Sequence, residues 1–258
     1  MLMNKTVELK SASELAIMRR AGAVVADTLS LLKDVVKPGM TTGEIDAIAR
    51  EQLERRQAKP AFLNYHGFPG VICVSVNHEV VHGIPSLART LKDGDIVGLD
   101  FGCIVDGWYA DAAVTVGVGR ISFEAERLIR VTKEALDKGV GAVKAGARVG
   151  DIGSAVQTYV EAAGYSVVRE FVGHGIGRSL HEEPPIPNFG KAGSGQRLKA
   201  GMTIAIEPMV NVGGHEVATL GDGWTAVTKD RSLSGHFEHT VVVTEDGSEI
   251  LTLPSGLI

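Results

Sequence analysis

The sequence has only two cysteines, Cys73 and Cys103, among its 258 residues. Two cysteines are too few for a disulfide framework, so we expect free thiols in a reducing compartment. Long apolar runs are missing too, since no stretch approaches the roughly 18 residues of a membrane-spanning helix. The amino-terminal segment also lacks an apolar core followed by a small-residue cleavage site. We therefore expect a cytoplasmic protein that does not bind a membrane.

A strong excess of either positive or negative charge is missing as well. The chain carries 26 basic and 31 acidic residues, and its formal charge is −5. The basic residues are scattered and form no stripe that could follow a phosphate backbone, which argues against nucleic acid as a partner. The sequence has neither a glycine-rich phosphate loop after a strand nor a Gly-x-Ser-x-Gly elbow. NTPase and serine-hydrolase functions therefore lack support.

The hydrophobic content is 44%, and no break in composition divides the chain, so we expect one domain spanning residues 1–258. Ser11 with Glu14 has the spacing of a capping box and predicts a long helix that ends before Pro38. Thr41 with Glu44 predicts a second helix in the same way. β-Branched segments between glycines and aspartates follow, and they predict strands joined by turns.

The sequence also contains an internal repeat. Val36 begins the segment VKPGMTTGEIDAIA, and Val143, 107 positions later, begins VKAGARVGDIGSAV. At the same offset, Leu91 begins LKDGDIVGLD and Leu198 begins LKAGMTIAIE. Two segments at one offset indicate a duplication. The repeat predicts an α+β fold with pseudo-twofold symmetry, in which each half supplies helices followed by strands and the site lies on the axis.

We place these pseudo-symmetric halves at about 10–120 and 121–255. In the register of the repeat, Asp100 lies opposite Glu207, each closing an apolar strand. After a further insertion of 20 residues, Asp111 lies opposite Glu238.

Any one of these acids, taken alone, is more simply read as a turn residue at the end of a strand. Four buried carboxylates on one axis repel each other unless some are protonated or cations hold them together. Two divalent ions, about 3.5–4 Å apart, would balance that charge and leave room for a shared water or hydroxide.

Two histidines, His174 and His181, lie in the glycine-rich segment GHGIGRSLHEEP. The glycines would let the backbone approach a crowded site. A neutral imidazole can bind a divalent metal, carry a proton or donate a hydrogen bond to an oxyanion. The alternative is that both are solvent-exposed loop histidines.

The segment His78-Glu79-Val80-Val81-His82 matches the HExxH pattern of single-zinc proteases. That pattern needs a helix, because two residues four apart share a face there, whereas on a strand they are about 13 Å apart. The apolar β-branched flanks favour strand and turn. We therefore expect His78 at the surface and His82 at a strand end, directed at the axis, while the single-zinc endopeptidase remains an alternative.

Several of these segments together resemble the type I methionine aminopeptidases of the pita-bread metallopeptidase family, over about residues 10–255. The most specific are NHEVVHGIP at 77–85, LDFGCIVDGWYAD at 99–111, GHGIGRSLHEEP at 173–184, IEPM at 206–209 and FEHT at 237–240. The resemblance implies a pita-bread fold and two divalent metal ions, cobalt, manganese, iron or zinc. The ligands it implies are Asp100, Asp111, His174, Glu207 and Glu238, with Asp111 and Glu238 binding both ions.

The resemblance also implies how the reaction proceeds. A metal-bridging hydroxide attacks the first peptide carbonyl, His181 steadies the oxyanion, His82 lies near the scissile nitrogen and Glu207 relays a proton. The side chains implied for the methionine pocket are Phe62, Tyr65, Phe68, Cys73, Leu180 and Trp224. Leu180 stands where many relatives carry an aromatic residue, and Phe68 where many carry tyrosine, so the edge of the pocket differs in shape.

The activity implied is removal of the initiator methionine from nascent polypeptides with a small second residue, by a monomeric, cytoplasmic, bacterial-style minimal enzyme. The resemblance leaves transient association with the ribosome open. A competing hypothesis is a non-catalytic relative that uses the fold to bind nucleic acid or ribosomes. Such relatives typically lose ligands, whereas all five are present here and no basic patch is evident.

Overall fold

The computed structural model describes residues 7–254, and its first helix, α1, spans Ala12–Val35. The predicted capping box is present at its start. The Glu14 backbone N–H donates to Ser11 Oγ at 3.4 Å, and Glu14 Oε2 accepts from the Ser11 backbone N–H at 2.9 Å. Helix α2, Thr42–Arg55, begins in the same way after Thr41. Both predicted helix starts are therefore confirmed.

The second half of the chain repeats this pair of helices. Helix α3 spans Phe123–Gly141 after the cap Ser122, and α4 spans Val149–Ala162. The segments before α2 and α4 make the same backbone contacts with later parts of the chain. In the first half the Gly39 N–H donates to the Leu91 carbonyl at 2.9 Å, and in the second half the equivalent bond joins Gly146 and Leu198 at 3.0 Å. Two isolated β-bridges are related by the same offset of 107 residues. One joins Thr41 to Thr90, and the other joins Arg148 to Arg197. The backbone therefore repeats at the offset of the sequence.

A nine-stranded antiparallel sheet forms the centre of the structure, with the order β1-β4-β5-β14-β9-β7-β8, while β2 pairs with β4 and β15 with β14. Its strands are β1 Lys59–Pro60, β2 Ile72–Val76, β4 Ile96–Val105, β5 Trp108–Gly117, β7 Gly173–Gly175, β8 Glu182–Ile186, β9 Thr203–Ile206, β14 Glu238–Val243 and β15 Ser248–Ile250. Strands from the two halves meet where β5 pairs with β14. The middle of the sheet is therefore built from both halves.

Two three-stranded sheets flank the main one, β13-β10-β6 and β11-β12-β3. Their strands are β3 Glu79–Val81, β6 Ser166–Val167, β10 Met209–Asn211, β11 Val217–Thr219, β12 Ala226–Thr228 and β13 Ser234–His236. A short 3₁₀ turn, η1, spans Tyr65–Gly67.

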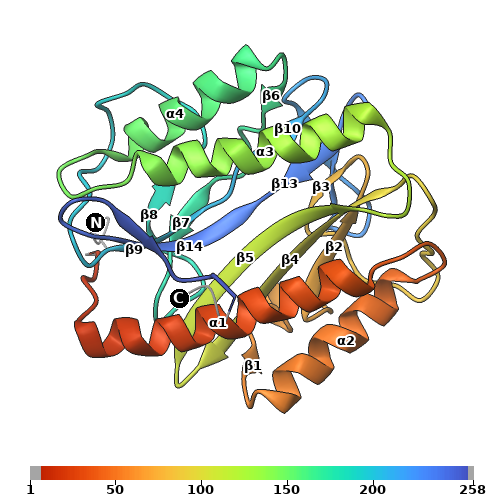
Figure 1. Ribbon diagram of the computed structural model, residues 1–258, viewed down its shortest axis with the longest axis horizontal. Helices are drawn as coiled ribbons and strands as arrows, with labels where there is room; N and C mark the ends of the chain where they lie inside the picture. The colour runs from red at the N-terminus through yellow and green to blue at the C-terminus, as the bar shows by residue number, and fades with distance from the viewer. Residues whose placement is uncertain (1–6, 255–258) are drawn as a thin grey trace.

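The helices cover one side of the sheet. Figure 1 shows α1 with α2 and α3 with α4 as two pairs, with β5 and β14 running between them. On α1, Val25 and Leu29 belong to the same apolar cluster as Leu99 of β4. On α3, Leu128 packs in a cluster with Val156 of α4. Burying apolar side chains in this way is the main favourable term for the fold, and it leaves the other face of the central strands for polar chemistry. No helix within residues 7–254 is long and apolar enough to span a bilayer.

The HExxH segment is not helical, which confirms the prediction of strand and turn. Glu79 begins β3, and its Oε2 accepts a hydrogen bond from the Val76 N–H at 2.7 Å, so this carboxylate closes a turn. His78 is partly exposed, in keeping with the prediction of a surface residue, and its Nε2 lies 3.3 Å from Arg231 Nη1. A zinc site that needs both histidines on one helical face has no support here.

Asp100 does not close its strand, contrary to the sequence prediction. It lies in the middle of β4, which continues to Val105. The residues that follow Asp100 are apolar and pair with β5 without a break, Phe101 with Ala112 and Cys103 with Ala110. The strand continues because both of its sides stay buried among apolar groups. Glu207 does follow directly after the end of β9.

A candidate metal centre on the central strands

Five adjacent strands of the main sheet each supply one candidate metal ligand. In sheet order these are Asp100 on β4, Asp111 on β5, Glu238 on β14, Glu207 directly after β9, and His174 on β7. Because neighbouring strands of a sheet are about 4.8 Å apart, side chains on one face of five strands converge on a single site.

The distances between the side-chain atoms fit a metal centre. His174 Nε2 lies 3.5 Å from Asp111 Oδ2 and 3.6 Å from Glu207 Oε1. One ligand atom each from Asp111, His174 and Glu238 lies within 4.8 Å of the other two. A divalent ion with bonds of about 2.0–2.2 Å spans such separations.

The backbone fixes the ring of His174 in the tautomer that a metal needs. Its Nδ1 donates to the Gly175 carbonyl at 2.9 Å, so the proton is on Nδ1 and Nε2 keeps its lone pair. Burial lowers the pKa of His174 to about 4, and the ring is therefore neutral at pH 7. The glycines beside it are required, because a Cβ at Gly175 would lie 2.2 Å from the Glu183 carbonyl oxygen. Glycine at this position therefore allows β7 to pack closely against β8.

The four carboxyl groups are strongly perturbed. Burial, followed by the charges of neighbouring carboxylates, raises the pKa of Asp100, Glu207 and Glu238 well above the ordinary values. Burial also raises the pKa of Asp111, to about 7. Asp100 Oδ1 is buried and has no hydrogen-bond partner among the described residues. A bound cation would favour the ionised form of these groups and supply that partner, so the donor set fits divalent metal ions.

Two more histidines lie beside the acidic cluster. The Tyr65 hydroxyl is 2.7 Å from His181 Nδ1, and the centroid of the His181 ring is 4.3 Å from that of His174. His82 contacts Phe171 and Trp224 edge to face, with ring centroids 5.3 and 6.2 Å apart. Burial lowers the pKa of His82 to about 4. His181 is exposed to solvent on one side, and partial desolvation of its ring, followed by the neighbouring His174, lowers its pKa to about 4 as well, so both rings are neutral at pH 7.

One cavity of about 130 Å³ joins these groups to an apolar wall. All thirteen side chains singled out from the sequence line it: Phe62, Tyr65, Phe68, Cys73, His82, Asp100, Asp111, His174, Leu180, His181, Glu207, Trp224 and Glu238. The apolar wall is aromatic, since the Phe68 and Trp224 rings meet edge to face with centroids 5.2 Å apart. Burial raises the pKa of the Cys73 thiol well above its ordinary value, so this cysteine is not a thiolate at pH 7.

Sequence reasoning missed the groups that support these side chains. The Thr240 hydroxyl is 3.1 Å from Asp111 Oδ1, and Asn188 Nδ2 donates to the Glu207 carbonyl at 3.0 Å. His236 Nε2 lies 3.7 Å from Glu207 Oε2. Thr240 and His236 each stand two residues from Glu238, so strand alternation around that ligand was a signal that could have found them. No such signal exists for Asn188.

Comparisons with known proteins agree with this geometry. Residues 16–245 match the profile of metallopeptidase family M24. The chain is 53% identical over 245 residues to a methionine aminopeptidase of Clostridium perfringens, covering 95% of this chain and 98% of that protein. It is 51% identical to methionine aminopeptidase 1 of Bacillus subtilis, covering 94% and 98%. The crystal structure of a methionine aminopeptidase from Thermotoga maritima superimposes with a TM-score of 0.95 at 46% identity, covering 96% and 100%. The fold is therefore the pita-bread fold of these enzymes.

Proposed function

This chain belongs to metallopeptidase family M24, and from that premise we propose that it removes the amino-terminal methionine of polypeptides at a centre of two divalent metal ions. The observation that carries the proposal is the convergence of four buried carboxylates and one imidazole from five adjacent strands. The proposed ligands are Asp100, Asp111, His174, Glu207 and Glu238.

Charge and strand order support two ions. Four ionised carboxylates carry the charge that two divalent cations neutralise, and the imidazole adds none. Asp111 and Glu238 lie on the two middle strands, β5 and β14, with Asp100 on one side and Glu207 with His174 on the other. We therefore assign Asp111 and Glu238 to both ions. Oxygen donors with one imidazole accept cobalt, manganese, iron or zinc, so the donor set does not choose among them.

The bound metal pair would polarise the peptide carbonyl and supply an activated water. The chain's own residues would then orient the substrate and move protons. If the Tyr65 hydroxyl donates to His181 Nδ1, the His181 proton is on Nε2, which can donate a hydrogen bond to the carbonyl oxygen. His82, neutral and held against Phe171, is assigned to the scissile nitrogen. Glu207 is assigned the proton relay, because its carboxyl group is buried and its pKa is raised.

The apolar wall is assigned to the methionine side chain. An unbranched thioether adapts to an irregular pocket and makes favourable contacts with aromatic edges. The assigned residues are Phe62, Tyr65, Phe68, Cys73, Leu180 and Trp224. The acidic side of the same cavity suits a free, positively charged amino terminus, which makes the enzyme an aminopeptidase. We also propose nascent polypeptides with a small second residue as substrates, transient association with the ribosome, a monomeric state and a cytoplasmic location.

The experiment that tests this function compares Met-Ala-Ser, Leu-Ala-Ser and acetyl-Met-Ala-Ser as substrates of metal-stripped protein, with and without added Mn²⁺ or Co²⁺. We expect cleavage of free Met-Ala-Ser alone, and only with metal. Glu207→Ala should lower kcat/KM by at least about a hundredfold, as loss of a group that stabilises the transition state does. Glu216→Ala is the matched control, because that carboxylate is exposed and, within residues 7–254, forms an ion pair with Lys229 at 3.3 Å, away from the acidic cluster. Cleavage of the acetylated peptide, or full activity of Glu207→Ala, would overturn the proposal.

A further inference from the structure

His236 is a buried polar side chain that the proposed reaction leaves without a role. It is the last residue of β13 and is only 4% exposed. Its Nε2 is buried and has no hydrogen-bond partner among the described residues. A buried N–H without a partner costs free energy, so such an atom needs an explanation.

The backbone of His236 is held firmly. Its N–H donates to Thr115 Oγ1 at 2.8 Å, and the same hydroxyl donates to its carbonyl at 2.8 Å. The residue also pairs with Met209 of β10. These contacts hold the backbone of β13 against β5 and β10. They do not involve the imidazole, which can therefore interact with the acidic cluster.

Strand alternation directs His236 at the acidic cluster. His236, Glu238 and Thr240 are two residues apart and share one face, because side chains along a strand alternate between faces. Glu238 is a proposed ligand, and Thr240 already contacts a ligand of the neighbouring strand, Asp111, at 3.1 Å. Phe237 faces the other way and packs in the apolar cluster under α3. His236 is therefore placed to support a ligand on the other side of Glu238.

That ligand is Glu207, whose two oxygens face two different imidazoles. Oε1 lies 3.6 Å from His174 Nε2, and Oε2 lies 3.7 Å from His236 Nε2. We propose that His236 is a positioning residue that carries its proton on Nε2 and directs it at Glu207 Oε2, which leaves Oε1 to face the metal. The proposal rests on the proposed function, since it assigns a partner to one of its ligands. The 3.7 Å separation is about half an ångström longer than a normal N–H···O hydrogen bond, so the proposal requires a side-chain rotation that brings the two atoms together when metal binds.

The proposal is tested by titrating Co²⁺ into metal-stripped protein by calorimetry, together with visible absorption spectra of the cobalt-loaded protein. His236→Leu fills the same space without an N–H, whereas His236→Gln restores a donor. We expect His236→Leu to weaken binding of one ion about tenfold and to change the cobalt spectrum, as loss of a partner to a metal ligand does. We expect His236→Gln to stay within about threefold of the unsubstituted protein.

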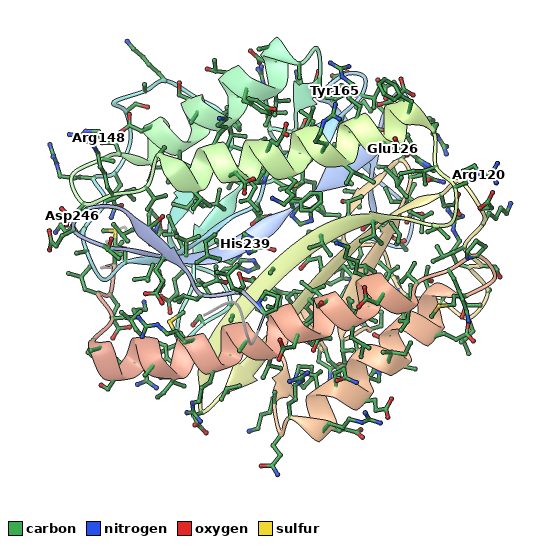
Figure 2. The ribbon with its side chains drawn as sticks, viewed as in Figure 1. Arg120, Glu126, Arg148, Tyr165, His239 and Asp246 are labelled. Carbon is green, nitrogen blue, oxygen red and sulfur yellow. The ribbon has the colours of Figure 1, made fainter. Side chains whose placement is uncertain are left out.

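His239→Leu is the matched control. His239 is a partly buried histidine three residues later, on β14, but it points to the helix side, where its Nδ1 lies 2.9 Å from Thr252 Oγ1 (Figure 2). Its replacement should lower the melting temperature and leave Co²⁺ affinity unchanged. Unchanged affinity in His236→Leu, or equal loss in His236→Leu and His236→Gln, would overturn the inference. If the unsubstituted protein binds no Co²⁺, the proposed function fails instead.

Discussion

At the scale of single residues, Trp224 contributes its ring to the apolar side of the cavity. Its ring meets Phe68 and His82 edge to face. Its backbone N–H is held independently, because it donates to Asp222 Oδ1 at 2.8 Å. Removal of the ring should therefore change the pocket without unfolding the loop that carries it.

We expect Trp224→Ala to lower kcat/KM for Met-Ala-Ser at least about tenfold, mainly by raising KM. The reason is that an apolar side chain packed against a large ring gains about 1.5–3 kcal/mol, and 1.4 kcal/mol corresponds to a factor of about ten. Leu220→Ala on the same loop is the control, since Leu220 is 39% exposed and its hydrogen bonds to Thr225 and Gly223 are made by the backbone. Steady-state kinetics of both variants decide the matter. Equal KM values in the two variants would contradict the assignment of Trp224 to the methionine pocket.

The proposed metal ligands could be named from the sequence because they lie in repeated or glycine-rich segments, whereas the pocket residues came from the family resemblance alone. The repeat paired Asp100 with Glu207 and Asp111 with Glu238, and the glycines marked His174. Strand alternation from Glu238 could have placed His236 on the face of the site, but it could not have paired His236 with Glu207. That pairing depends on how the residue after β9 lies beside β13, and this is a contact between segments with no fixed offset in the sequence. Asp100 was misplaced for a related reason, because an aspartate after apolar residues is more often a strand end than a strand centre.

At the scale of elements, the two halves differ in how their second helices begin. Thr41 caps α2, since its Oγ1 accepts from the Glu44 N–H at 3.2 Å and its own N–H donates to Glu44 Oε2 at 2.7 Å. Arg148 occupies the equivalent position before α4. Only the reciprocal bond is present there, from the Arg148 N–H to Asp151 Oδ2 at 2.7 Å, because a guanidinium cannot accept.

Arg148→Thr should therefore complete the capping box of α4. The backbone dihedrals favour it, with φ −122° and ψ 157° at Arg148 against φ −91° and ψ 154° at Thr41. We expect a gain of about 1 kcal/mol in the free energy of unfolding, which raises the melting temperature by about 2 °C in a chain of this length. Thermal unfolding followed by circular dichroism measures it.

The control for that substitution is Arg148→Ala. It loses the same bond from the Arg148 guanidinium to the Gly195 carbonyl, 2.6 Å long, but gains no cap. The difference between the threonine and alanine variants isolates the cap. If both variants melt at the same temperature, a threonine at position 148 does not cap α4 in the way that Thr41 caps α2.

At the scale of the whole molecule, the repeat predicted which segments correspond but not how the strands would be ordered. The pairing of β5 with β14 joins the halves, and it brings Asp111 and Glu238 together at the middle of the sheet. Strand order depends on how the two helix pairs pack side by side on one face of the sheet, which no short pattern encodes. The chemistry of the centre follows from that pairing, because it forces carboxylates from both halves into one buried space.

Burying these carboxylates makes the stability of the metal-free protein depend on pH. Burial raises the pKa of Asp111 to about 7, and it raises the pKa values of Asp100, Glu207 and Glu238 well above their ordinary values, so the folded state holds protons that these groups lose when the chain unfolds. The unfolded chain has already lost those protons near pH 4, so the free energy of unfolding falls as the pH rises. His174 and His82 act in the opposite direction, because their pKa values are lowered to about 4, but only below about pH 6.5. Above pH 6.5 the histidine contribution fades as the unfolded chain loses its imidazolium protons, and the carboxyl groups dominate the slope.

We therefore expect the melting temperature of metal-stripped protein to fall as the pH rises from 6.5 to 8. Each carboxyl group that stays protonated in the folded state costs about 1.4 kcal/mol of unfolding free energy per pH unit. With excess Co²⁺ the slope should disappear or reverse, because metal binding releases the protons and stabilises the folded state. Glu207→Gln, which removes one titrating group, should flatten the metal-free slope, whereas Glu216→Gln at the surface should not. A metal-free melting temperature that stays constant or rises over this range would mean that the carboxylates are already ionised in the folded protein, and the charge argument for two ions would then fail.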